Sequence, residues 1–293
     1  MNRIQENILE STRRSYRTLR AKLLSVGLRQ HAHFDQSLDE AEASGLMSII
    51  VPVGDIATQV LTRCLGSLEK YAPRAEVILV DDGSTRAELS QILTDYCDRN
   101  HWKTIRYEVP RGHSRATEAG AALATRPYLC LLNSDTIVTP WSWSGARMAF
   151  EMDRTIGITG PSTSHATTPQ NLRSARYCRH YWTDSQVWAF ARRQAQKYRQ
   201  SGMVDLKEVG GFALFIRQDV WQSLGGFDET LPDYGNEMDL CRRAIKSGWK
   251  IVWTRVNYIH HLGGMTYQRE KDESFSVPAY PIVAPKANPQ STI

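Results

Sequence analysis

Acidic and imidazole side chains occur at four places in this chain where they could bind a metal ion, accept a proton or hold a phosphate. The four motifs are Asp81-Asp82, Asn133-Ser134-Asp135, Asn236-Glu237-Met238-Asp239 and His260-His261. A carboxylate beside a polar amide suits a hard divalent cation that also contacts phosphate oxygens, and an imidazole beside glycine can ligate a metal. Each motif alone also has a structural interpretation, because carboxylates commonly cap helices. Their order along the chain is therefore more informative than any one of them.

Two of these motifs end apolar runs that are typical of buried strands. The runs span residues 47–53, 76–82 and 128–135, and helical patterns over residues 57–70, 86–100 and 114–124 lie between them. Alternating strands and helices predict a mostly parallel sheet with helices on both faces. Ligands of such sheets bind at the carboxyl ends of the strands, where Asp82 and Asp135 fall. Further along we expect a helix over 184–200, a strand and a helix within 209–229, a helix over 237–247 and a last strand over 250–256.

The composition is that of an ordinary folded protein. With 293 residues, 41% of them apolar and 23% charged, the chain can form one large or two ordinary domains and is not mainly disordered or collagen-like. The net charge of +5 does not imply nucleic-acid binding. The five cysteines include no CxxC pair and are interpreted as reduced. The sequence lacks a signal-peptide pattern and a membrane-spanning run, so we expect a cytoplasmic protein.

The two ends of the chain differ from its centre. Residues 1–30 carry apolar residues at helical spacing among arginines, which predicts an amphipathic basic helix within an N-terminal extension over residues 1–46. This helix would pack on the main domain or on a second copy in a homodimer, or else contact a partner protein or, peripherally, the inner face of the membrane. Residues 47–267 form the predicted main domain, and residues 268–293 form a proline-rich tail.

The series SIIVPV, VDDGST, LLNSDTIV, GGFDE with YGNEMDL, and HHLGG resembles the family 2 inverting glycosyltransferases. The resemblance covers about residues 47–266 and is specific as a series. It implies the GT-A fold, a Rossmann-like, mostly parallel central sheet flanked by helices, to which this chain adds its N-terminal helical extension. It also implies transfer of a sugar from a nucleoside diphosphate sugar to a saccharide, lipid-linked or peptide acceptor.

The resemblance assigns residues to the donor and acceptor sides of the site. It implies that Asp82 accepts a hydrogen bond from the base of the nucleotide, and since uracil and thymine both offer an N3 hydrogen, UDP- or dTDP-sugars are favoured as donors. The implied donor-binding residues are Pro52, Val53, Asp55, Asp82, Gly112, Ser134 and Asp135. The implied acceptor-side residues are Gly211, Phe212 and Asp239.

The resemblance also implies a base and a metal. Glu237 falls at the position of the catalytic base, which takes the proton of the acceptor nucleophile as the donor is displaced directly. Asp135 falls at the metal-binding end of the family's DXD element, so Mg²⁺ or Mn²⁺ would neutralise the departing diphosphate there. His260 is the best match for a histidine near the metal, and His261 is the alternative because the register is uncertain by one residue.

The chain departs from the family pattern at several positions. Asn133 and Asn236 stand where relatives usually have acids, and Pro110 and Glu118 stand where relatives often have asparagine. These departures motivate an alternative function, a catalytically weak GT-A module that binds nucleotide sugars and serves assembly. A dinucleotide oxidoreductase is disfavoured, because the first strand leads into Pro52-Val53-Gly54-Asp55 and not into a GxGxxG turn.

Overall fold

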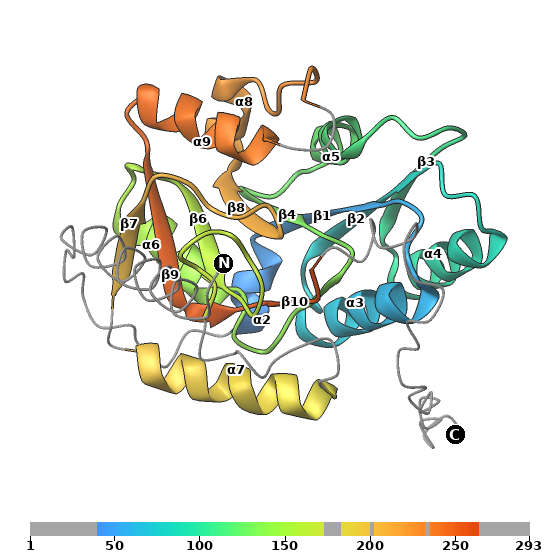
Figure 1. Cartoon of the computed structure of the whole chain (residues 1–293), viewed down its shortest axis with the longest axis horizontal. Helices are drawn as coiled ribbons and strands as arrows, with labels where there is room; N and C mark the ends of the chain where they lie inside the picture. The colour runs from blue at the N-terminus through green and yellow to red at the C-terminus, as the bar shows by residue number, and fades with distance from the viewer. Residues whose placement is uncertain (1–39, 173–182, 200–201, 232–234, 264–293) are drawn as a thin grey trace, which may run out of the picture.

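One mixed sheet forms the centre of the fold, and helices cover both of its faces (Figure 1). The computed structural model describes residues 40–172, 183–199, 202–231 and 235–263. The sheet has the strand order β3-β2-β1-β4-β8-β6-β9-β7. Its strands are β1 (Met47–Val53), β2 (Glu76–Asp82), β3 (Lys103–Tyr107), β4 (Tyr128–Leu132), β6 (Ile156–Ser162), β7 (Met203–Leu206), β8 (Ala213–Arg217) and β9 (Lys250–Tyr258). A second, two-stranded ladder joins β5 (Thr136–Ile137) to β10 (His260–His261).

The helices form two layers around this sheet. Figure 1 shows α5, α8 and α9 above the sheet and α3 and α7 below it. The helices are α2 (Glu40–Gly45), α3 (Thr58–Tyr71), α4 (Ala87–Asn100), α5 (His113–Ala122), α6 (Ser144–Met152), α7 (Asp184–Tyr198), α8 (Gln218–Leu224) and α9 (Asn236–Lys246). A capping box in which Thr183 and Gln186 bond each other's backbone fixes the start of α7.

Apolar residues on both faces of the central strands hold these layers together. In β1, Ile49 and Val51 belong to the core shared with α3, whereas Ile50 belongs to the core shared with α5. All seven residues of β1 are buried. Because successive side chains of a strand point to opposite faces, only a strand covered on both sides is apolar throughout. The continuous run MSIIVPV therefore encodes a central strand.

The pairing of the strands confirms the predicted mostly parallel sheet. Strands β3, β2, β1 and β4 are all parallel to one another, and β6 is parallel to β9. The antiparallel pairs, β4 with β8, β8 with β6 and β9 with β7, join these two parallel groups and close one edge. The predicted helices and strands lie within a few residues of the observed ones.

One predicted strand is wrong at its end, and several elements were not predicted. The strand expected over residues 128–135 stops at Leu132, and Asn133, Ser134 and Asp135 form a turn before β5. The elements without a prediction are β3, β5, β6, β7, β10 and α6. Strand β3 lies at the edge of the sheet and is largely exposed, so its sequence KTIRY lacks the apolar run that marks a buried strand.

The predicted N-terminal extension is described only at its end. Residues 40–45 form α2, and the Glu40 carboxylate accepts hydrogen bonds from the backbone of Trp143 and Ser144 at 2.9 and 3.0 Å. A carboxylate at this place stabilises the positive end of α6. The predicted amphipathic helix over residues 1–30 and the proline-rich tail lie outside the described residues. Among the helices that the structure does describe, none is both long enough and apolar enough to cross a bilayer.

The partly buried carboxylate of Glu76 joins β2 to β1, to β3 and to the segment before β4. Glu76 at the start of β2 accepts hydrogen bonds from the Ser48 hydroxyl, from the ammonium of Lys103 at 2.6 Å, and from the backbone and hydroxyl of Thr125 at 2.7 and 2.8 Å. Burial alone would raise the pKa of Glu76, but these hydrogen bonds stabilise the charged form and lower the pKa to about 2. The folded state therefore favours ionised Glu76.

We expect Glu76→Gln to lower the free energy of unfolding by about 1 to 3 kcal/mol at neutral pH, the usual cost of breaking a partly buried, charge-assisted hydrogen-bond set. Because the folded-state pKa is depressed, this stabilisation is complete above the ordinary pKa of 4.5 and is lost as the pH falls toward 2. Urea unfolding of both proteins should show the gap closing across this window. Glu69→Gln, which breaks a more exposed ion pair with Arg99, should have a smaller effect at neutral pH. A gap that stayed constant as the pH fell would contradict this account of Glu76.

Candidate active site

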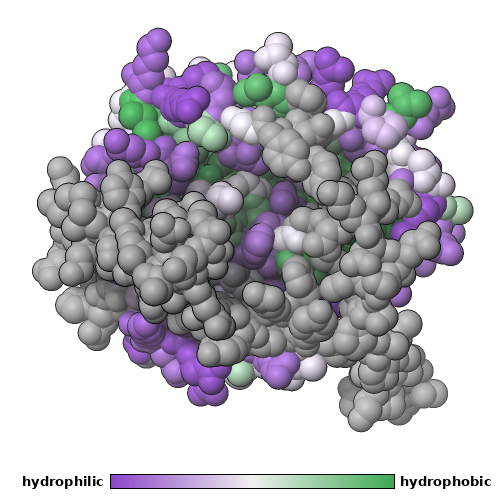
Figure 2. Space-filling view, viewed as in Figure 1, coloured by the Kyte–Doolittle hydropathy of each residue, from purple (hydrophilic) through white to green (hydrophobic). Residues whose placement is uncertain are grey.

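The carboxyl ends of three neighbouring strands bring the predicted donor-side residues to one edge of the sheet. Strands β2, β1 and β4 are adjacent and parallel, so Asp82, Val53 and the turn that contains Asp135 follow strand ends on the same side. Pro52 and Val53 close β1, and both are buried. Figure 2 shows the molecule hollowed near the middle of the face seen in Figure 1. This edge is where a ligand of a parallel sheet is expected.

Carboxylates order the loops at this edge, and one of them binds two loops to each other. Asp55, which follows β1, accepts hydrogen bonds from the backbone and hydroxyl of Thr85 at 3.0 and 2.7 Å. Asp81 is buried and accepts a hydrogen bond from the Ser84 backbone at 2.9 Å, while its other oxygen pairs with Arg106. Asp55 therefore shapes the predicted nucleotide side of the site by holding the loop after β2 against the loop after β1.

Asp82 orients the segment that leads into α5. Its two carboxylate oxygens accept hydrogen bonds from the backbone N–H groups of Arg111 and Gly112, at 2.7 and 2.9 Å. Gly112 has a φ of 92°, a conformation that glycine adopts without strain. A carboxylate offers about four acceptor positions, so Asp82 keeps capacity for a further donor such as the N3–H of a pyrimidine.

Asp135 and His261 form the most enclosed polar pair of the site. The Asp135 carboxylate lies 3.2 Å from Nε2 of His261, and their side chains are only 5% and 12% exposed. The His261 ring stacks on Phe212, with ring centres 5.3 Å apart and an interplanar angle of 20°. Its Nδ1 donates to the His165 carbonyl at 2.8 Å. Phe212 and His165 thus fix the orientation of the imidazole.

The environment of His261 changes its proton affinity. Burial by itself disfavours the imidazolium, but the neighbouring Asp135 carboxylate and the His165 carbonyl outweigh burial and raise the pKa of His261. In contrast, burial and the proximity of His261 lower the pKa of the His165 side chain. The carboxylate and the imidazole are therefore electrostatically coupled.

The structure gives the two predicted histidines different partners. His260 is fully buried, and its Nδ1 lies 2.9 Å from the Tyr258 hydroxyl. His261, the alternative, is the residue that meets Asp135. The reason is strand geometry, since both histidines lie in β10 and successive side chains of a strand point in opposite directions. Pairing of β10 with β5 sets which of the two faces the site.

The Asp135–His261 pair has the donor chemistry of half a metal site. Asp135 and His261 would offer a Mg²⁺ or Mn²⁺ ion one carboxylate oxygen and one imidazole nitrogen, both held in place within the fold. The remaining ligands would come from water or phosphate oxygens. Asn133 directs its backbone N–H to the Phe212 carbonyl, and Ser134 is buried beside it. In the described ranges no group of three or more His, Cys, Asp or Glu residues is arranged to hold a metal ion.

Glu237 is positioned by a glycine and a buried amide. A methyl group placed on Gly211 would overlap the Glu237 carboxyl, so this carboxyl lies directly on the glycine backbone. The Asn236 side chain is fully buried, donates to the Ser114 hydroxyl at 2.9 Å and accepts from the Glu237 backbone at 3.0 Å. Asn236 thereby joins the first turn of α9 to α5 and fixes the residue that follows it.

Two consecutive residues, Gly211 and Phe212, connect the parts of the site. Gly211 supports the Glu237 carboxyl, and Phe212 stacks on His261, which contacts Asp135. Motifs that are more than 100 residues apart in the sequence, Asp135 and Glu237, therefore adjoin one dipeptide.

Asp239 has a different environment from its neighbour Glu237. Its carboxylate accepts a hydrogen bond from Nε of Arg243 at 2.7 Å. The remaining nitrogens of Arg243 donate to the carbonyls of Leu224 and Gly226, each at 2.7 Å. Asp239 thus holds an arginine that fastens the glycine turn after α8. Asp239 and Glu237 therefore have different roles although they are close in sequence: Asp239 binds Arg243, whereas the Glu237 carboxyl lies on Gly211.

Sequence reasoning missed two residues that shape the site. His165 supplies the carbonyl that orients His261. Gln170 is fully buried, accepts from the Gly210 backbone at 2.7 Å and donates to the Pro161 carbonyl at 2.8 Å, so it fixes the loop that carries Gly211. Both lie in a serine- and threonine-rich stretch that contains no recognisable motif. The presence of one histidine and one glutamine among small residues was the only sequence feature that could have pointed to them.

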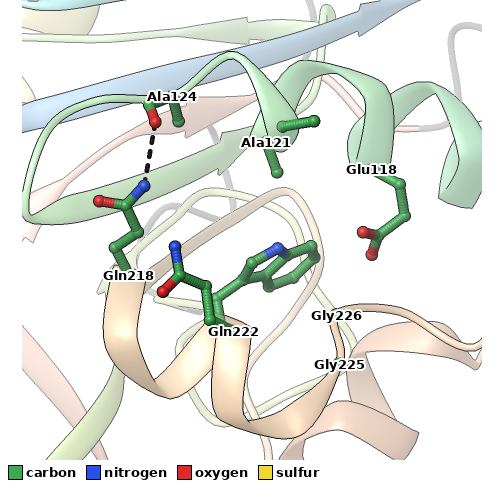
Figure 3. Close-up of a pocket in the computed structure, with 9 residues that line it drawn as sticks. Glu118, Ala121, Ala124, Gln218, Gln222, Gly225 and Gly226 are labelled. Carbon is green, nitrogen blue, oxygen red and sulfur yellow. Dashed lines mark hydrogen bonds between the residues drawn. The ribbon is translucent and has the colours of Figure 1, made fainter.

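A separate cavity lies away from these groups. It occupies about 300 Å³ between α5 and α8 and is lined by Glu118, Ala121, Ala122, Ala124, Gln218, Trp221, Gln222, Gly225 and Gly226 (Figure 3). Of these lining residues, Gly225 and Gly226 belong to the GGFDE motif of the family resemblance, and the others lie outside the predicted site. Glu118 accepts a hydrogen bond from the Phe227 backbone, and burial raises its pKa. The carboxyl that replaces asparagine here therefore serves the junction of α5 with the loop after α8.

The fold and the site define an α/β protein of the GT-A type, with its polar groups at the carboxyl edge of a mostly parallel sheet. A model of the family described as "Glycosyl transferase family 2" matches residues 48–224, more than half of the chain. The chain belongs to glycosyl transferase family 2.

Solved structures of glycosyltransferases share this fold. A structure of GalNAc-T7 with UDP, GalNAc and Mn²⁺ has a TM-score of 0.58 at 18% identity and covers 78% of this chain and 44% of that one. The mannosyltransferase PcManGT of Pyrobaculum calidifontis, in complex with GDP-Man and Mn²⁺, has a TM-score of 0.57 at 14% identity and covers 83% of this chain and 63% of its own. At these identities the likeness concerns the fold alone.

Among curated proteins, the O-antigen biosynthesis protein RfbC of Myxococcus xanthus is 25% identical over 258 residues, which are 83% of this chain and 20% of that protein. An uncharacterized protein of Mycobacterium tuberculosis is 41% identical over 61 residues, 20% of this chain and 23% of its own length. The chain thus spans about a fifth of the length of the curated relatives it matches.

We expect Asn236→Ala to lower the free energy of unfolding by about 1 to 3 kcal/mol, because it removes the two hydrogen bonds of a fully buried amide. Ser114→Ala removes the bond shared with Asn236 and the bond that its hydroxyl donates to the Leu231 carbonyl. The double variant should therefore cost less than the sum of the two single variants, since both remove one shared bond. Urea unfolding of the four proteins gives this coupling. Strict additivity would show that the amide does not join α9 to α5.

Proposed function

We propose that the protein is an inverting glycosyltransferase that moves a sugar from a UDP- or dTDP-sugar to an acceptor nucleophile. The observation that supports this most strongly is the common attachment of Glu237 and the Asp135–His261 pair to Gly211 and Phe212. Direct displacement needs a base on one side of the anomeric carbon and stabilisation of the departing diphosphate on the other. Because the two sets of groups adjoin one dipeptide, their arrangement supports placing both around one reacting carbon.

Each group of the site would have one task. Glu237 would accept the proton of the acceptor hydroxyl as the bond to the sugar forms, and inversion follows from attack opposite the leaving group. Asp82 would orient the nucleotide by accepting the N3–H of a pyrimidine base. Asp135, with His261, would hold Mg²⁺ or Mn²⁺. When bound, such an ion supplies Lewis-acid stabilisation to the diphosphate.

The comparisons support the donor class and the metal without assigning them to this chain. The structures of GalNAc-T7 and PcManGT contain Mn²⁺ together with UDP or GDP-Man, and TarS of S. aureus was solved with UDP. The preference for UDP or dTDP rests on Asp82, which would accept the N3–H that uracil and thymine share. The acceptor would be a saccharide, lipid-linked or peptide nucleophile.

We expect Glu237→Gln to lower kcat by about a hundredfold or more, the usual cost of removing a general base, while donor affinity stays nearly unchanged. Release of nucleoside diphosphate from UDP- and dTDP-sugars, with and without acceptor, gives the rate, and calorimetry gives the affinity. Gly211→Ala should act in the same direction, because its methyl group displaces the Glu237 carboxyl.

Glu88→Gln, an exposed carboxylate on α4, is the control and should behave as the unmodified protein. Full transfer activity in Glu237→Gln would remove Glu237 as the base. No transfer by the unmodified protein from any donor, with nucleotide binding retained, would favour the alternative of a nucleotide-sugar-binding assembly module.

For the metal we expect Asp135→Ala and His261→Gln each to weaken Mn²⁺-dependent binding of UDP by at least about tenfold, as loss of a ligand or its close support commonly does. His260→Gln should keep the Mn²⁺ dependence while lowering the melting temperature, since it breaks the buried contact with Tyr258. Calorimetry with UDP, in the presence of Mn²⁺ or of a chelator, measures the first effect. Loss of Mn²⁺ dependence in His260→Gln alone would reverse the assignment of the two histidines.

A further inference from the structure

The outer face of α9 carries apolar and basic side chains together. Met238 and Ile245 are 41% and 44% exposed, and their separation of seven residues places them on one face of the helix. Arg242 lies between them, and its guanidinium is 3.1 Å from the Met238 sulfur. Lys246 follows Ile245 and is also exposed. Thus apolar groups and cations occupy the same side of α9.

This face borders a shallow cleft between α9 and the segment after β7. The cleft measures about 370 Å³ and is lined by Lys207, Glu208, Met238, Arg242, Ile245 and Lys246, which we call the α9 surface. Figure 2 shows apolar residues set among hydrophilic ones at the upper left, where Figure 1 places α9.

The charges of the α9 surface favour an anionic partner. Three of its six residues are cations and one, Glu208, is an acid. The next cation along α9, Arg243, is bound to Asp239 and to two backbone carbonyls, so it stabilises the helix and leaves Arg242 and Lys246 to face outward. Exposed apolar side chains flanked by lysine and arginine are the pattern of helices that lie in the interface of an anionic bilayer.

We propose that the α9 surface binds the headgroup layer of an anionic phospholipid membrane. Met238 and Ile245 enter the boundary between headgroups and acyl chains, while Lys207, Arg242 and Lys246 contact lipid phosphates. The contact is peripheral and uses one face of a helix whose other face is buried: Leu240, Cys241 and Ala244 of α9 belong to the core above the sheet.

The position of this surface has a consequence for the acceptor. Met238 directly follows Glu237, so a protein held by the α9 surface would carry its proposed base close to the bilayer, where a membrane-bound acceptor would present its hydroxyl. This consequence rests on the proposed function, whereas the membrane contact itself does not.

The experiment is sedimentation of the full chain with vesicles, comparing equal parts of phosphatidylglycerol and phosphatidylcholine with phosphatidylcholine alone. The unmodified protein should bind the anionic vesicles more strongly, and salt should weaken the binding. Ile245→Ser with Lys246→Ser should reduce the binding by about tenfold or more, because one inserted side chain and one surface cation are lost together.

A matched control tests whether position matters. Met152 is 41% exposed and Arg154 is exposed at the end of α6, away from α9. Met152→Ser with Arg154→Ser therefore removes the same kinds of side chain and should leave vesicle binding unchanged. Both double variants should keep the melting temperature and the affinity for UDP, which shows that the fold and the nucleotide side are intact.

Several results would overturn the proposal: no vesicle binding, equal binding to neutral vesicles, or equal loss in the two double variants. It would also be overturned if binding persisted in Ile245→Ser with Lys246→Ser, as when residues 1–30 alone carry it, or if sedimentation without vesicles showed that the α9 surface joins two copies of the chain. Nucleotide release from UDP-sugars, measured in parallel, separates the two proposals. Vesicle binding without sugar transfer would leave the membrane contact standing and the proposed function refuted.

Discussion

The site depends on a close approach that only glycine permits. At Gly211 the absence of a side chain lets the Glu237 carboxyl rest on the backbone, and the next residue, Phe212, presents its ring to His261. Any larger residue at 211 would move the carboxyl outward and change its distance from the Asp135–His261 pair. The relative placement of two distant motifs is therefore set by one short segment between β7 and β8.

That segment is itself held by neutral buried groups. Gln170 fixes Gly210, and Asn236 fixes the backbone of Glu237. Asn236 occupies a position where relatives usually have an acid, yet it is fully buried and both ends of its amide are satisfied. An amide can donate and accept in such a place, whereas an ionised carboxylate could only accept and would lose its hydration. The departure is thus consistent with a working site.

The sequence predicts the sheet well and the site only in part, for physical reasons. Buried strands such as β1, which is apolar except for Ser48, are easily recognised, but β3 at the edge is exposed and carries no such pattern. The motifs ending β2 and β4 could be placed at one edge because parallel strands align their carboxyl ends. Which histidine faces Asp135 could not be predicted, because it depends on the pairing of β10 with β5, and one step of register exchanges the two sides of a strand.

The carboxylates show the same division between sequence and structure. Asp55, Asp82 and Asp239 appear equivalent to Glu237 as sequence features, yet each is bound to a particular partner: Asp55 to Thr85, Asp82 to the backbone before α5, and Asp239 to Arg243. These carboxylates order the loops around the site. Glu237 receives its position from the groups that surround its backbone and from the glycine beneath it. Helix α9 carries Glu237 in its first turn and the α9 surface on its outer side. Binding of the α9 surface to a membrane would therefore also hold the Glu237 carboxyl near that membrane. Helix α9 would thus connect the proposed catalytic base to the proposed membrane contact.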